Sequence, residues 1–88
     1  IHKNPSSIQK NPIQVRSPSQ VEVNALLENY HKGQYDLAEN LATNITQKYP
    51  DHQFSWKVLG AVFQLTGRLQ ESLIANQRAV AISIKFFH

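Results

Sequence analysis

The sequence predicts an all-α fold in which two helical hairpins follow an extended N-terminal arm. From residue 19 onward the apolar residues recur three or four places apart, which puts them on one face of a helix. Two isolated glycines, Gly33 and Gly67, divide this part of the chain at an interval of 34 residues. No stretch alternates with a period of two for long enough to predict a strand.

Residues 1–18 differ from the rest of the 88-residue chain in composition and charge. They contain three prolines and few large apolar groups, so they cannot bury enough surface to offset the entropy of ordering. The net charge of +3 lies wholly in this segment, because residues 21–88 carry six basic and six acidic residues. We therefore expect an extended or disordered basic arm before a neutral folded part, and no specific nucleic-acid binding.

The first predicted helix begins next to the arm and ends at Gly33. Two starting points fit, because residues 17–20 and residues 19–22 both have the spacing of a capping box. With the earlier start, Pro18 would occupy the first helical position, which suits proline. The apolar face comprises Val23, Leu26, Leu27 and Tyr30.

The second predicted helix begins near Gln34 and ends before Pro50, because proline cannot continue a helix. Its expected buried face consists of Leu37, Ala38, Leu41, Ala42 and Ile45. The third helix is predicted from His52 to Leu65, with Trp56, Leu59, Gly60 and Phe63 on one stripe and Val58 and Val62 beside it.

The fourth predicted helix begins near Leu69 and continues through residues 81–87. Its expected inward residues are Leu73, Asn76, Ala79 and Val80.

The string Trp56-x-x-Leu59-Gly60-x-x-Phe63, together with the 34-residue period and Pro50, resembles the tetratricopeptide repeat (TPR) family. The resemblance implies an α-α superhelix of two TPR hairpins, residues 19–52 and 53–86. The sequence departs from the pattern in three places: Glu22 stands where tryptophan is usual, Ala25-Leu26 stands where Leu-Gly is usual, and Ile84 stands where the closing proline would be.

In this family the first helix of each hairpin lines a concave groove that binds a peptide or partner protein. The resemblance therefore implies a groove lined by Gln20, Val23, Leu27, Tyr30, His31, Phe54, Lys57, Ala61 and Gln64. Only Lys57 fits the residues with which some members hold a terminal carboxylate, so a more apolar ligand is favoured. The alternative is that Val23, Leu27 and Phe54 pack against a neighbouring repeat or the arm.

Two repeats leave one flank of the last helix uncovered, and repeat arrays need about three units or a cap. We expect either more repeats in a parent protein or another chain over this flank. A homo-oligomer would form through Leu73, Val80, Ile84, Phe86 and Phe87. The absence of any methionine also favours a piece of a longer reading frame or a processed product.

The sequence offers no catalytic or metal-binding pattern. It has no cysteine, no glycine-rich phosphate loop, and four histidines without metal-site spacing. No apolar run approaches the length of a membrane span. We therefore expect a non-catalytic, cytoplasmic protein-interaction module that needs neither cofactor nor metal and does not enter a membrane.

A second hypothesis comes from another class of protein. The run from Phe54 to Val62, after a Pro50-Asp51-His52 turn, looks like the N-terminal repeats of bacterial glycosyltransferases and sulfotransferases. On that reading the chain scaffolds or presents substrate for an enzyme whose catalytic domain is absent.

Overall fold

The computed structural model describes residues 17–86, which form four α-helices and no strand. These are α2 (Gln20–His31), α3 (Tyr35–Lys48), α4 (Gln53–Leu65) and α5 (Leu69–Lys85). The predicted all-α fold is confirmed. Most of the predicted arm, residues 1–16, lies outside the described residues.

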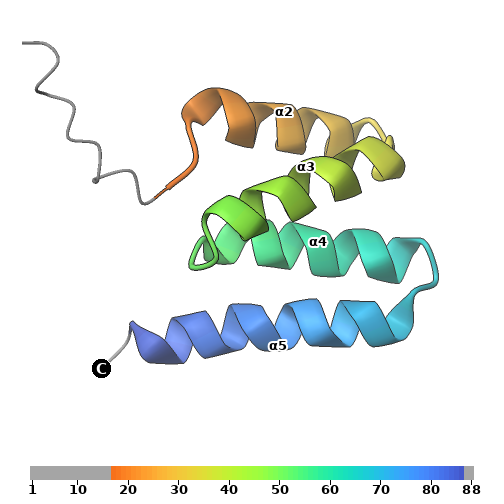
Figure 1. Ribbon diagram of the computed structural model, residues 1–88. Coiled ribbons are helices and arrows are strands. Elements are labelled where there is room, and N and C mark those ends of the chain that lie inside the picture. Colours follow the sequence, from red (N-terminus) through yellow and green to blue (C-terminus); the bar gives the residue numbers. More distant parts are fainter. Residues whose placement is uncertain (1–16, 87–88) are drawn as a thin grey trace, which may run out of the picture.

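The helices stack in chain order, and each runs roughly antiparallel to the one before it (Figure 1). Every helix packs on its neighbour in the sequence, and α4 with α5 forms the most extensive pair. Consequently α5 lies at one end of the stack, and α3 and α4 occupy its middle.

A capping box sets the start of α2. The backbone N–H of Glu22 donates to Ser19 Oγ at 3.1 Å, and the backbone N–H of Ser19 donates to Glu22 Oε1 at 2.9 Å. Of the two starts that the sequence allowed, the chain therefore uses residues 19–22 and leaves Pro18 outside the helix. Glu22 also accepts a hydrogen bond from Lys48 Nζ at 2.8 Å, and this contact most strongly lowers the pKa of the Glu22 carboxyl.

Both hairpin turns use a glycine in the left-handed region, with φ of 77° at Gly33 and 82° at Gly67. Residues with a Cβ adopt this backbone only at a cost of about 1–2 kcal/mol. The two glycines thus end α2 and α4 in the same way, as their spacing predicted.

The core runs through all four helices and is built from nine buried apolar residues and their half-buried neighbours. The nine are Leu26, Ala38, Ala42, Ile45, Val58, Leu59, Val62, Phe63 and Ala75. The prediction for Leu37 was wrong, because this side chain is 51% exposed while Ala38 beside it is completely buried.

Helices α4 and α5 approach closely where Gly60 of α4 lies against residues 72–76 of α5. Ser72 Oγ donates to the carbonyl of Gly60 at 2.8 Å, and both residues are buried. A Cβ added at Gly60 would overlap with the side-chain amide of Asn76, so that this side chain would have to move. Glycine at this position therefore lets α5 lie directly against α4.

The inward face of α5 differs from the predicted one. The buried residues are Ser72, Ala75, Ala79 and Ile82, whereas Leu73 and Val80 are 58% and 57% exposed. Asn76 is also exposed, so only Ala79 of the four expected residues is buried. Small residues, namely Ser72, Ala75 and Ala79, make up most of the buried face of α5, and the larger Ile82 is buried nearer its C-terminal end.

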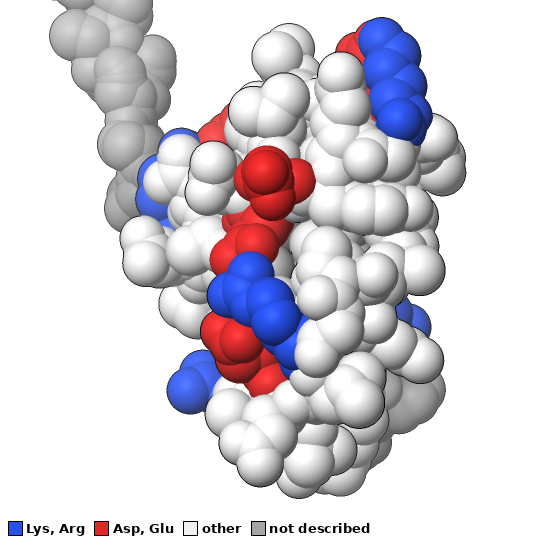
Figure 2. Space-filling model, turned by 90° about the vertical axis from the view of Figure 1, so that its right-hand side faces the viewer, with Lys and Arg blue, Asp and Glu red and all other residues white. Residues whose placement is uncertain are grey.

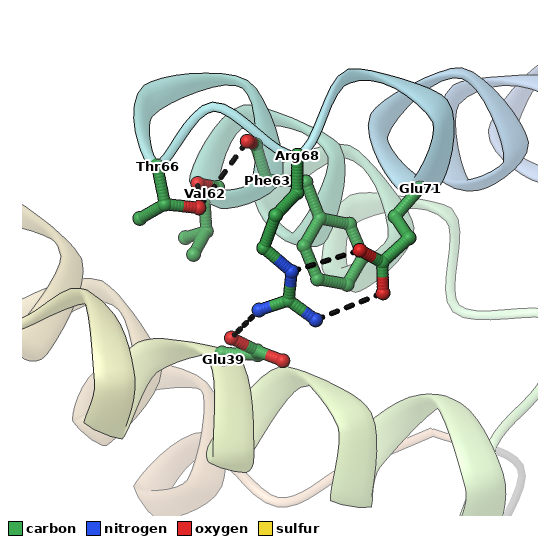
Figure 3. A network of polar contacts seen from close by, with 6 residues as sticks. All are labelled: Glu39, Val62, Phe63, Thr66, Arg68 and Glu71. Carbon is green, nitrogen blue, oxygen red and sulfur yellow. Dashed lines mark hydrogen bonds and ion pairs between the residues drawn. The ribbon is translucent and has the colours of Figure 1, made fainter.

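Arg68, at the N-cap of α5, connects the two hairpins through a surface network (Figure 3). Its Nη1 donates to Glu39 of α3 at 2.6 Å, and its Nε and Nη2 donate to Glu71 at 2.8 Å each. The guanidinium also lies 4.5 Å from the ring centroid of Phe63. Figure 2, which shows the right-hand side of Figure 1, has acidic and basic side chains next to each other on this face.

No helix within residues 17–86 has both the length and the apolar character needed to cross a membrane.

The approach at Gly60 predicts a coupling between two substitutions. Gly60→Ala adds a methyl group that displaces Asn76, and this displacement offsets the gain of up to about 1 kcal/mol in helix propensity. In an Asn76→Ala background that displacement is no longer needed. We expect Gly60→Ala to be more favourable there by about 1 kcal/mol, measured by urea unfolding of the four chains of a double-mutant cycle. Strictly additive effects would contradict the described contact.

Candidate functional site

A surface hollow of about 250 Å³ lies between α2 and α4, the first helices of the two hairpins. We call it the α2–α4 hollow. Its lining residues are Leu27, Tyr30, His31, Phe54, Lys57, Val58 and Ala61.

Helical spacing explains how the lining residues come together. Leu27, Tyr30 and His31 are three and four residues apart and therefore lie on one side of the last turns of α2. Phe54, Lys57 and Ala61 have the same spacing and line one side of α4. The turn at Gly33 and the packing of α3 against both helices place these two sides next to each other.

The hollow combines an apolar lining with basic groups and contains no acid. Phe54 is 40% exposed, although most large apolar side chains of α4 are buried. Lys57 is exposed and makes no ion pair with any residue in the described part of the chain. Chemically, the site offers an apolar contact surface beside a cation that has not been neutralised.

Most of the groove residues expected from the sequence meet in this hollow. Leu27, Tyr30, His31, Phe54, Lys57 and Ala61 all line it. Three expected residues are absent from the lining, namely Gln20, Val23 and Gln64. Val58 was assigned to the core alone. It is indeed 6% exposed, yet part of it reaches the hollow, which helical periodicity does not reveal.

Two further hollows lie at the ends of the hairpins. One, of about 450 Å³, is lined by Gly33, Gln34, Tyr35, Asp36, Leu37 and Thr66. The other, of about 300 Å³, is lined by Asp51, Gln53, Ile82, Ser83 and Phe86.

Phe86 lines the second of these end hollows, whereas the other described residues predicted for self-association do not. Phe86 faces the start of α4 together with the inward residue Ile82. Leu73, Val80 and Ile84 instead lie on the exposed side of α5. Phe87 lies outside the described residues.

His52 is the N-cap residue of α4 and precedes Phe54, which lines the α2–α4 hollow, by two residues. Its Nδ1 is 2.7 Å from the hydroxyl oxygen of the buried Ser55, and its ring meets Phe54 edge-on with 6.3 Å between centroids. Burial lowers the pKa of His52 below its ordinary value. The neutral imidazole therefore belongs to the folded state at neutral pH.

Within residues 17–86 no three acidic or histidine side chains come close enough together to hold a metal ion. Comparisons with protein-family models, with curated proteins and with solved structures find no significant match. The resemblance to the TPR family therefore stays a prediction from the sequence.

The lowered pKa of His52 predicts a loss of stability in mild acid. At pH values above about 6.5, the usual histidine pKa, folded and unfolded chains both hold a neutral imidazole. Below pH 6.5, the usual histidine value, the imidazole of the unfolded chain takes up a proton before that of the folded chain. The free energy of unfolding therefore decreases as the pH is lowered, until His52 is protonated in the folded chain as well. Urea unfolding between about pH 5 and 7 would show a shallower decline in the H52N variant than in the native chain. An equal decline of the unfolding free energy in H52N and in the native chain would contradict this prediction.

Proposed function

We propose that this chain is a non-catalytic protein-interaction module that binds a peptide segment of a partner in the α2–α4 hollow. The observation that carries the proposal is the convergence of six expected groove residues, from two separate helices, on one hollow. A merely structural use of Phe54 would bury it, yet it stays 40% exposed beside unpaired Lys57.

The size of the hollow favours a peptide over a small molecule. Sites for whole ligands usually measure about 300–1,000 Å³ and enclose most of the ligand. A hollow of about 250 Å³ on an open helical surface suits one or two side chains of a longer segment. We expect an aliphatic or aromatic residue to contact Phe54 and Leu27, and a neighbouring carboxylate to pair with Lys57.

We also propose a TPR-type arrangement for the two hairpins. Three features support it: the 34-residue interval, the positive φ at both Gly33 and Gly67, and the small residues where α4 meets α5. In such an arrangement the first helices of successive hairpins are neighbours, as α2 and α4 are around the hollow.

Peptides selected from a random display library on the native chain would test this function. We expect the selected peptides to pair an apolar residue with an acidic one, and to shift the NMR signals of the hollow residues. The variants F54S and K57E should each weaken binding by about tenfold or more, which corresponds to about 1.4 kcal/mol.

Leu65→Ser supplies the matched control for this experiment. Leu65 belongs to the same helix and is 56% exposed, but it does not line the hollow. The L65S variant should therefore bind like the native chain. Failure to select any peptide, or equal binding by F54S, K57E and L65S, would refute the proposed function.

A further inference from the structure

Helix α5 exposes most of its large apolar residues, and apart from Ile82 the residues that it buries are small. Four exposed side chains form a line along the helix, which we call the outer stripe: Leu69 (65% exposed), Leu73 (58%), Val80 (57%) and Ile84 (66%). Their spacing of four and seven residues keeps them on one side of the helix. The side that faces α4 carries Ser72, Ala75 and Ala79 instead.

The position of α5 leaves this stripe free within the described part of the chain. The helix is the last in the stack, and its main packing partner is α4 (Figure 1). A stripe of this kind on a small protein marks an interaction surface, because single exposed apolar residues are common but contiguous rows are not.

The residues of the outer stripe are arranged symmetrically about the middle of the helix. Leu73 precedes Asn76 by three residues, and Val80 follows Gln77 by three. Leu69 precedes Asn76 by seven residues, and Ile84 follows Gln77 by seven. The spacing of apolar and amide residues is therefore the same in both directions, with two leucines before the central amide pair and a valine and an isoleucine after it.

Such a pattern is self-complementary when two copies of the helix meet antiparallel. A twofold axis between Asn76 and Gln77 would place Leu73 opposite Val80 of the partner, and Leu69 opposite Ile84 of the partner. The same patch then serves both subunits, as closed twofold symmetry requires. The amides at the centre can hydrogen-bond across the axis, and a polar residue within an apolar helix seam is a known device for fixing the register.

The charges of α5 are compatible with this pairing. The charged residues within the helix, Glu71, Arg78 and Lys85, are spaced seven apart and lie on the side away from the stripe. Glu71 is paired with Arg68, Lys85 lies 3.4 Å from Asp51, and Arg78 lies over the Trp56 ring. A helix packed on the outer stripe would bury no charge.

We propose that two copies of this chain associate through the outer stripes of their α5 helices, packed antiparallel about a twofold axis at Asn76 and Gln77. The assembly covers the exposed side of α5 in both copies. It leaves the α2–α4 hollow of each copy free, since none of the residues lining that hollow belongs to α5.

Sedimentation of the native chain and of two matched variants tests the surface. Leu73 and Ile74 are neighbours with almost equal exposure, 58% and 55%, but they lie on different sides of α5. We expect a dimer for the native chain and for I74E. L73E should weaken it by about a hundredfold, because the symmetry introduces the buried carboxylate twice.

Mixing two weakened variants tests the register. L73E and V80K should each be monomeric, and their mixture should form a heterodimer, because the introduced carboxylate of one faces the introduced ammonium of the other. The remaining pair in that heterodimer is the native leucine and valine.

Disulfide trapping tests orientation without relying on dissociation, since the chain has no cysteine of its own. Q77C, next to the axis, should oxidise to a covalent dimer. L69C should not, because its two copies would lie about 22 Å apart along the helix axis. A mixture of L69C with I84C should cross-link.

Several outcomes would overturn the proposal. A native chain that stays monomeric up to millimolar concentration would do so, as would a dimer that L73E and I74E leave equally intact. Cross-linking of L69C with itself would instead indicate parallel helices. Failure of L73E and V80K to associate with each other would exclude the register.

Discussion

The close approach of α5 to α4 at Gly60 determines how the rest of this small protein is arranged. Because Gly60 lacks a side chain, Ser72 hydrogen-bonds to its carbonyl and the Asn76 amide occupies the space where a Cβ would be. The side of α5 that packs there carries the small residues Ser72, Ala75 and Ala79. Apart from Ile82, the larger apolar residues of α5 lie on its exposed side.

This arrangement gives the molecule two different apolar surfaces. Between α2 and α4, Leu27 and Phe54 line a hollow of about 250 Å³ beside Lys57. Along α5, the outer stripe is a row of uncharged residues that extends over nearly the whole helix. The first surface is concave and local, and the second is convex and extended, so we assign them to different partners.

Polar contacts fix the ends of the helices that hold these surfaces in place. Ser19 and Glu22 cap α2, and Lys48 connects that cap to the end of α3. Arg68 joins α3 to the start of α5 through Glu39 and Glu71. Such exposed ion pairs add little to stability by themselves. The Glu22–Lys48 pair joins the two helices of the first hairpin, whereas the Arg68–Glu39 pair joins the first hairpin to the second.

The sequence by itself determined the number of helices, both glycine turns and most of the groups that line the α2–α4 hollow, because these depend on spacing along one chain. Only the tertiary structure decided between the two possible caps of α2, the exposure of Leu37 and the buried face of α5. Periodicity marks Leu73 and Val80 as a helix face just as it marks Ala75 and Ala79. Which face is buried depends on the shape of the neighbouring helix, and the face that carries most of the small residues lies against Gly60.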